Sequence, residues 1–345
     1  MEEMLVNNRI ENDLKQWQER EMRFYNLLAI SAANNQPLLK EKLRQYELLA
    51  AKYKFTENTD EKQTLRFLNI EKSRISKQLY PNFIVRLLRK TASHLQNDIV
   101  IRKEKKLKQE NIQVLHDQVQ RLGFPNLSQK IKENSIKDKD SFTIPLSYHI
   151  NEYQKIDHTI LFSKSETGLY KINGFTTNIE NKFNEQENRE YYFELKNGYC
   201  ENITQAYNLL SGRAVKCKDS WIQMDFNDKD SSNKYKIKEF YSEYNYNLVK
   251  ELQQLPMKQF KSSDDKEKFI ASLKNGNKEK IIIIKNKKEY EFLIEANPQF
   301  RSFNFYGKDD KKSSISTIVN KKSQTKTRIN SELPLHNLKT KSQKI

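Results

Sequence analysis

The spacing of apolar residues changes once along this chain, near Ser141, and that change indicates the fold class. Between about residues 9 and 133, apolar side chains recur every three to four positions, with few prolines or glycines to interrupt them. This is the period of helices with one buried face. From Ser141 to Ile150, apolar and polar residues alternate strictly, as in a strand with one buried face. We therefore expect an α+β protein whose N-terminal region is all helical and whose second region is mixed and largely antiparallel.

Proline marks the main break between the predicted helices. Pro81 separates a third helix, about residues 61–79, from a long fourth helix, about residues 82–122, because proline fixes φ and removes a hydrogen-bond donor. We expect Thr59 or Asp60 to cap the third helix. The fourth helix is polar and has a thin apolar seam, which is typical of a helical hairpin or a coiled coil. The seam consists of Leu107, Ile112, Leu115, Val119 and Leu122.

The second region predicts many short strands and three short helices. Pro145 favours an edge position for the first strand, and residues 285–288 form the turn of a hairpin. The predicted strands cover residues 141–150, 159–163, 168–176, 189–195, 214–218, 221–226, 234–240, 280–285, 290–295 and 302–306. The predicted helices cover residues 203–210, 247–255 and 264–274.

These patterns predict three parts of the chain. Residues 1–135 form a helical, basic domain, and residues 140–307 form the α+β domain, which is strand-rich over residues 140–200. Residues 308–345 form a basic tail rich in Lys, Ser, Thr and Asn. We expect this tail to be disordered, because it cannot bury enough apolar surface to offset the entropy of ordering.

The positive charge of the chain is localised. The net charge is +17, and two segments account for all of it. Residues 62–108 carry 13 basic residues against three acidic ones, and residues 308–345 carry ten against three. A localised basic surface is typical of proteins that bind phosphate groups. An alternative is that the lysines reflect the composition bias of the genome.

The basic helical segment is the strongest candidate for a binding site. Its cations lie on the two helices around Pro81 and could hold a nucleic-acid backbone without reading its sequence. The predicted nucleic-acid-binding residues are Lys72, Arg74, Lys77, Arg86, Arg89, Lys90, Arg102, Lys103, Lys105 and Lys106. A basic amphipathic helix can also lie on an anionic membrane or bind an acidic partner.

Motifs of catalysis, cofactor binding or metal binding are absent from the sequence. No two of the five histidines have the spacing of helix-borne metal ligands, and seven glycines leave no phosphate-cradling loop. Asp225, Asp228 and Asp230 could hold Mg²⁺, but they are more typical of a solvated turn. Cys200 and Cys217 are expected to be ordinary thiols. We expect no enzymatic activity, no cofactor and no metal.

Three segments carry a resemblance to a known family. They are Gln205 to Val215 (QAYNLLSGRAV), Trp221 to Phe226 (WIQMDF) and Ile294 to Phe300 (IEANPQF). In their order and spacing, residues 190–307 resemble an accessory-domain family of bacterial conjugative transposons and of the polyvalent proteins of such elements and phages. Including the preceding region, the resemblance covers about residues 120–309. It implies a link to mobile genetic elements, and the family has no assigned catalytic residues to carry over.

Together these observations predict a non-enzymatic accessory protein of a conjugative or other mobile element that binds nucleic acid, with DNA as the expected ligand, through residues 62–108. The alternative is a protein-interaction or oligomerisation module, which self-associates through the N-terminal helices and acts in transfer, anti-defence or defence complexes without nucleic acid. A nuclease or hydrolase with a diffuse carboxylate site is the third class. Because no apolar run suits a signal peptide or a membrane span, we expect a cytoplasmic protein without a membrane partner.

Overall fold

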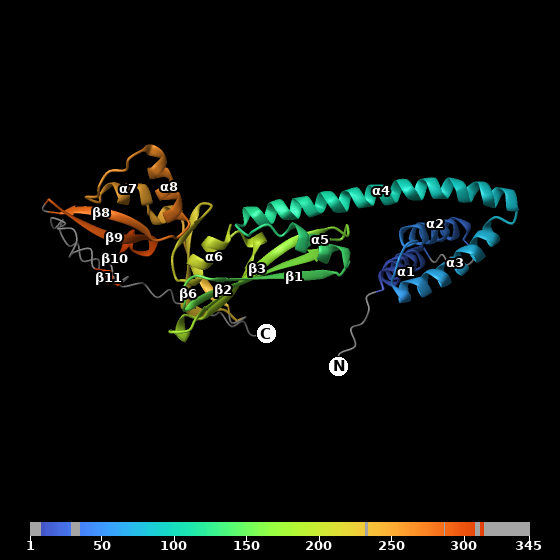
Figure 1. The fold of residues 1–345 in the computed structure, drawn as a ribbon, viewed down its shortest axis with the longest axis horizontal. Coiled ribbons are helices and arrows are strands. Elements are labelled where there is room, and N and C mark those ends of the chain that lie inside the picture. Colours follow the sequence, from blue (N-terminus) through green and yellow to red (C-terminus); the bar gives the residue numbers. More distant parts are fainter. Residues whose placement is uncertain (1–7, 29–34, 232–233, 286, 308–310, 314–345) are drawn as a thin grey trace, which may run out of the picture. The chain divides into compact units, whose positions relative to one another are not determined.

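The computed structural model describes residues 8–28, 35–231, 234–285, 287–307 and 311–313. In these ranges the protein has the expected α+β fold, with helices first and three antiparallel sheets after them (Figure 1). The chain divides into two compact units, Met1–Leu210 and Ser211–Ile345. The change of period near residue 140 therefore separates helices from strands, whereas the division between compact units lies inside the region expected to be a single α+β domain.

Five helices begin the first unit. Asparagine side chains cap three of them: Asn35, Asn58 and Asn82 each accept hydrogen bonds from backbone N–H groups of the first turn. The cap of the third helix is thus one residue earlier than expected, and the fifth helix was not predicted as a separate element. The helices are α1 (Arg9–Leu28), α2 (Gln36–Lys52), α3 (Thr59–Leu79), α4 (Phe83–Arg121) and α5 (Ser128–Ile136).

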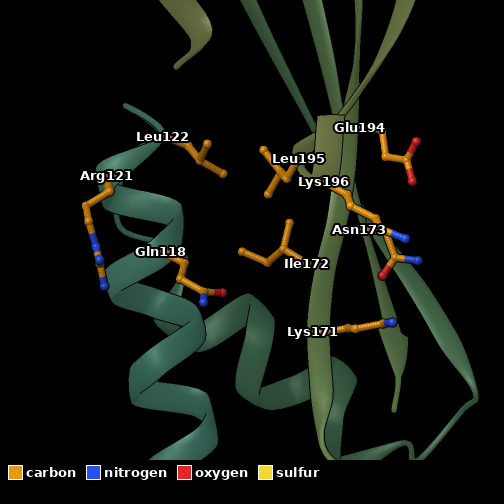
Figure 2. A pocket seen from close by; sticks show the side chains of 9 residues that line it. All are labelled: Gln118, Arg121, Leu122, Lys171, Ile172, Asn173, Glu194, Leu195 and Lys196. Atoms are coloured by element: carbon orange, nitrogen blue, oxygen red, sulfur yellow. The ribbon is translucent and has the colours of Figure 1, made fainter. Parts of the chain in front are cut away.

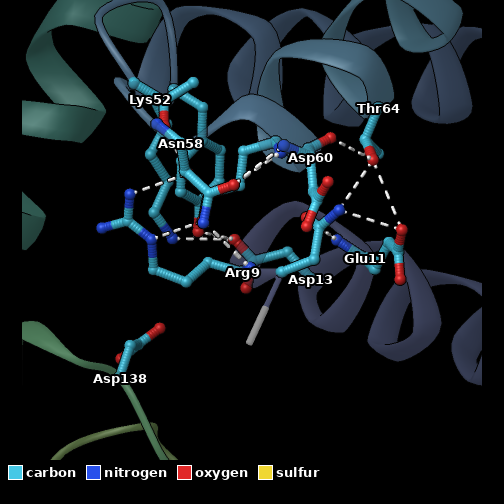
Figure 3. A network of polar contacts seen from close by, with 12 residues as sticks. Arg9, Glu11, Asp13, Lys52, Asn58, Asp60, Thr64 and Asp138 are labelled. Carbon is cyan, nitrogen blue, oxygen red and sulfur yellow. Dashed lines mark hydrogen bonds and ion pairs between the residues drawn. The ribbon is translucent and has the colours of Figure 1, made fainter. Parts of the chain in front are cut away.

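A polar network joins α1, α2 and α3 (Figure 3). It lies beside two small apolar clusters, one around Ile10 and Leu68 and one around Leu43 and Ile75. The Glu61 side chain is only 1% exposed, and its two oxygens accept hydrogen bonds from Nε and Nη2 of Arg9 at 2.7 and 2.8 Å. Asp13 on α1 accepts hydrogen bonds from Lys52 Nζ at 2.9 Å and from the Tyr53 hydroxyl at 2.8 Å. These contacts connect α1 to the end of α2 and to the start of α3.

The first sheet packs against the second half of α4. Its strands are β1 (Ser141–His149), β2 (Gln154–Lys164), β3 (Tyr170–Asn181) and β4 (Arg189–Glu194), which are antiparallel in the order β1-β2-β3-β4. Pro145 therefore lies in an edge strand, as expected. Asn111 of α4 exchanges two hydrogen bonds with the backbone of Tyr170, at 2.9 and 3.0 Å. Helix α6 (Ile203–Leu210) contacts β3 and β4 and ends the unit.

The second unit contains two further sheets around one apolar core. The core includes Trp221, Leu273, Ile281 and Phe305. The elements are β5 (Val215–Cys217), β6 (Ser220–Lys229), β7 (Tyr235–Phe240), α7 (Leu248–Gln253), α8 (Ser263–Lys274), β8 (Glu279–Lys285), β9 (Lys288–Asn297), β10 (Ser302–Tyr306) and β11 (Lys312–Ser313). The sheet orders are β5-β6-β7 and β11-β10-β9-β8.

Strand β11 corrects part of the expected tail. Lys312 and Ser313 pair with β10 in an antiparallel register, so the chain is ordered beyond residue 308 at this point. Pairing with the edge of β10 supplies backbone hydrogen bonds. Such bonds cannot be predicted from the amino-acid composition of the tail. Residues 308–310 and 314–345 of the predicted tail lie outside the described residues. Cys200 and Cys217 are both buried.

One ionisable side chain is buried in the first sheet. His158 is 3% exposed, and its Nδ1 lies 2.9 Å from the hydroxyl of Thr177. The rings of Phe124 and Phe175 lie close to its imidazole. Burial lowers the pKa of His158 to about 4, and the nearby charge of Asp157 offsets this only partly.

We predict that His158 makes the protein acid-sensitive. The pKa of histidine is about 6.5 in an unfolded chain. Between pH 6.5 and pH 4 the unfolded chain therefore binds a proton that the folded chain excludes, and the free energy of unfolding falls as the pH falls. For this group the full loss is about 3 kcal/mol. Urea titrations from pH 7 to pH 4 should show a flatter profile for His158→Gln than for the wild type. The variant His149→Gln, at an exposed site in β1, should keep the wild-type profile, and an unchanged profile for His158→Gln would contradict the prediction.

Candidate functional site

Four neighbouring cations project from the middle of α4. Arg102, Lys103, Lys105 and Lys106 are all exposed, and we call them the α4 cation cluster. Five consecutive residues cover nearly one and a half helical turns, so these side chains fan out around the exposed side of the helix. In the described part of the chain, no carboxylate forms an ion pair with Arg102, Lys103 or Lys105. The pair between Lys106 and Glu110 is long, at 3.8 Å, and lies on the surface.

The acidic residue inside this segment faces the other way. Glu104 is half-buried and forms ion pairs with Lys108 at 3.0 Å and with Lys52 of α2 at 3.4 Å. Burial acts to raise the pKa of Glu104, but the charge of Lys52 and the hydrogen bond from Lys108 outweigh it and lower the pKa. The carboxylate is therefore ionised and already neutralised on the inner side. The outer side of residues 102–106 is left purely cationic.

Arg89 is largely buried and joins α4 to α2. Its guanidinium donates to both carboxylate oxygens of Glu47 on α2, at 2.7 and 3.1 Å, and lies over the ring of Tyr80. Ser93 donates to the same carboxylate at 2.6 Å. This bidentate contact fastens the first half of α4 to α2. Arg89 was predicted to bind phosphate, but the structure shows it engaged within the protein.

Three other predicted residues also have partners inside the protein. Arg86 donates to the backbone carbonyls of Tyr80 and Pro81. Arg74 forms an ion pair with Glu71, one helical turn earlier, at 2.9 Å. Lys72 donates to the side chain of Asn69, and burial lowers its pKa. The remaining two, Lys77 and Lys90, are exposed but lie apart from the α4 cation cluster. Lys90 is roughly 18 Å before Arg102 along the helix.

The orientation of α4 was not anticipated. In its first half, the side chains that face α2 are polar: Arg89 and Ser93 contact Glu47, and Asn97 is buried. The apolar side chains of this half point outward instead, and four that share one side of the helix are about two-thirds exposed. They are Ile84 (66%), Leu88 (65%), Leu95 (69%) and Ile99 (67%). Their spacing of four, seven and four residues was visible in the sequence, but which side of the helix they occupy depends on the partner of Arg89.

A groove lies between the end of α4 and the first sheet (Figure 2). Its volume is about 570 Å³. Leu122, Ile172 and Leu195 point toward one another in its centre, whereas Lys171 and Glu194 point away from the helix (Figure 2). The centre of the groove is therefore mainly apolar and does not form a phosphate cradle.

Other kinds of site find no support in the described ranges. Those residues contain no group of three or more His, Cys, Asp or Glu side chains that could hold a metal ion. None of the helices in these ranges combines the length and the apolar character that crossing a bilayer requires. Comparisons with family models, with curated proteins and with solved structures gave no match to this chain.

The structural role of Arg89 can be tested by stability. We expect Arg89→Ala to lower the free energy of unfolding by about 2 kcal/mol, because the poorly exposed carboxylate of Glu47 loses its partner. The adjacent and exposed Lys90 is a matched control, and Lys90→Ala should change the free energy of unfolding by less than about 0.5 kcal/mol. Chemical denaturation of both variants measures the difference. Equal effects would mean that the contact with Glu47 does not hold α4 in place.

Proposed function

We propose that this chain is a non-enzymatic nucleic-acid-binding protein that holds a phosphate backbone against the α4 cation cluster. The observation that carries the proposal is the purely cationic outer side of residues 102–106, where the only acidic residue faces inward. Phosphates brought to this surface would release condensed counterions, which favours binding. A regular helix also holds the cations at fixed spacing without the entropy of ordering a loop.

The chemistry of the cluster favours backbone contacts over base recognition. One arginine and three lysines with long, exposed side chains suit phosphate oxygens, and these contacts carry no sequence information. The groove at the end of α4 is lined by residues other than the cluster. We therefore propose binding without sequence preference.

The resemblance of residues 120–309 to the accessory-domain family supports a conjugative or other mobile element as the context, and we propose DNA as the ligand. A second function, protein interaction, is favoured by a different observation. The outward apolar residues of α4 lie beside the cation cluster and have no partner in the described part of the chain.

We predict that binding to DNA has a steep salt dependence that depends on the α4 cation cluster. The triple variant Arg102→Gln, Lys103→Gln, Lys105→Gln removes up to three phosphate contacts. Each contact contributes about 0.9 to the slope of log affinity against log salt, so the slope should become shallower by about 3. Fluorescence anisotropy with labelled single- and double-stranded DNA across a salt series measures this slope.

A control of equal charge separates the cluster from net charge. The variant Lys261→Gln, Lys268→Gln, Lys274→Gln removes three exposed lysines from the second unit and should keep the wild-type slope. If both triple variants lose affinity equally, net charge alone drives binding. If the wild-type protein does not bind DNA or RNA at low salt, the proposed function is wrong.

A further inference from the structure

The outward side chains of Ile84, Leu88, Leu95 and Ile99 form a row on α4, which we call the α4 apolar row. Each is 65% to 69% exposed. Residues four and seven apart lie on the same side of a helix, so the row is continuous along about four turns. Contiguous exposed apolar surface is uncommon in proteins without a partner for it.

The pattern of the row is symmetric about its own midpoint. Ile84 and Ile99 lie equally far before and after the midpoint, and so do Leu88 and Leu95. Thr91 and Ala92 lie at the centre. A two-fold axis through this midpoint would place Ile84 against Ile99 and Leu88 against Leu95 of a second copy. Such an interface uses the same surface on both chains. The small side chains at the centre permit close approach of the two helices.

We propose that α4 pairs with α4 of a second copy of this chain, in antiparallel orientation, through the α4 apolar row. The symmetry of the row argues for a second copy as the occupant, because the same four side chains on two antiparallel helices face one another. The opposite side of α4 is already occupied by α2, through Arg89, Ser93 and Glu47. Among the described residues, the row therefore remains exposed.

Electrostatics favours the antiparallel over the parallel orientation. In a parallel pair, each α4 cation cluster would lie beside its copy at a helix-to-helix distance of about 10 Å. That is close to one screening length at physiological salt, about 8 Å, so the two clusters would still repel each other. In the antiparallel pair the two Arg102 residues lie on opposite sides of the axis, roughly 32 Å apart along the helices. This separation exceeds the screening length several times.

The antiparallel pair would also set the spacing of the two cation clusters. Their centres would lie roughly 38 Å apart, from the rise of 1.5 Å per residue. One turn of B-DNA is about 34 Å. This consequence, unlike the pairing itself, rests on the proposed function. It deepens that proposal, because both clusters could contact one face of a single duplex.

The mass of the full chain in solution tests the pairing. Light scattering across a concentration series should show a reversible dimer in the wild type, and Leu88→Glu or Leu95→Glu should raise its dissociation constant at least ~10-fold, because a carboxylate would be buried in the pair. Ile136→Glu, at a 60% exposed position of α5, is the matched control and should remain dimeric. Both substituted leucines are exposed, so circular dichroism should show wild-type helix content. A wild-type monomer at all concentrations, or a dimer unaffected by both leucine variants, would overturn the proposal.

Disulfide formation tests the orientation. Ile84→Cys and Ile99→Cys should each give little crosslinked dimer alone under mild oxidation, whereas a mixture of the two should crosslink, because residue 84 meets residue 99. The native Cys200 and Cys217 are buried and do not compete at the surface. Crosslinking of Ile84→Cys with itself would overturn the antiparallel arrangement. DNA binding tests the proposed function independently of the pairing. A dimer that binds no DNA would support the pairing and contradict the proposed function. A monomer that binds DNA would contradict the pairing and support the proposed function.

Discussion

The bidentate contact between Arg89 and Glu47 sets the orientation of α4, and the surface of the first unit depends on that orientation. One helix of 39 residues packs against two different neighbours. In its first half it meets α2 through polar side chains. In its second half it meets the first sheet through Asn111, and Leu115 and Val119 are buried there. Because a charged group with a poorly exposed partner is costly to separate, the polar contact fixes which side of the first half faces solvent.

Both candidate surfaces follow from this orientation. The same inward rotation that brings Arg89 to Glu47 brings Glu104 to Lys52, so the segment around residue 104 has only cations on its outer side. It also turns Leu88 and Leu95 outward. A cationic surface and an apolar surface therefore follow one another along a single helix. We have proposed a phosphate backbone for the first and a second copy of the chain for the second.

Most elements of the fold could be predicted from local patterns, and the exceptions have physical reasons. Strand alternation located β1 and β10 closely, and Pro145 correctly indicated an edge strand. Strand β11 was missed because its two residues are polar and are held only by pairing with β10. The division between compact units lies inside the region expected to be one α+β domain, and the contact of Asn111 with Tyr170 joins α4 to the first sheet across 59 residues of chain.

The sequence by itself determined the order of helices and strands and the location of the positive charge, because hydrophobic period, proline position and composition are local properties. Only the tertiary structure decided which cations stay available. In sequence, Arg89 and Arg102 are equivalent, as both lie on the same basic helix. They differ because Glu47, 42 residues before Arg89, lies opposite one of them and not the other. Such pairing between distant segments depends on how the helices pack, and helix packing cannot be predicted from local sequence patterns.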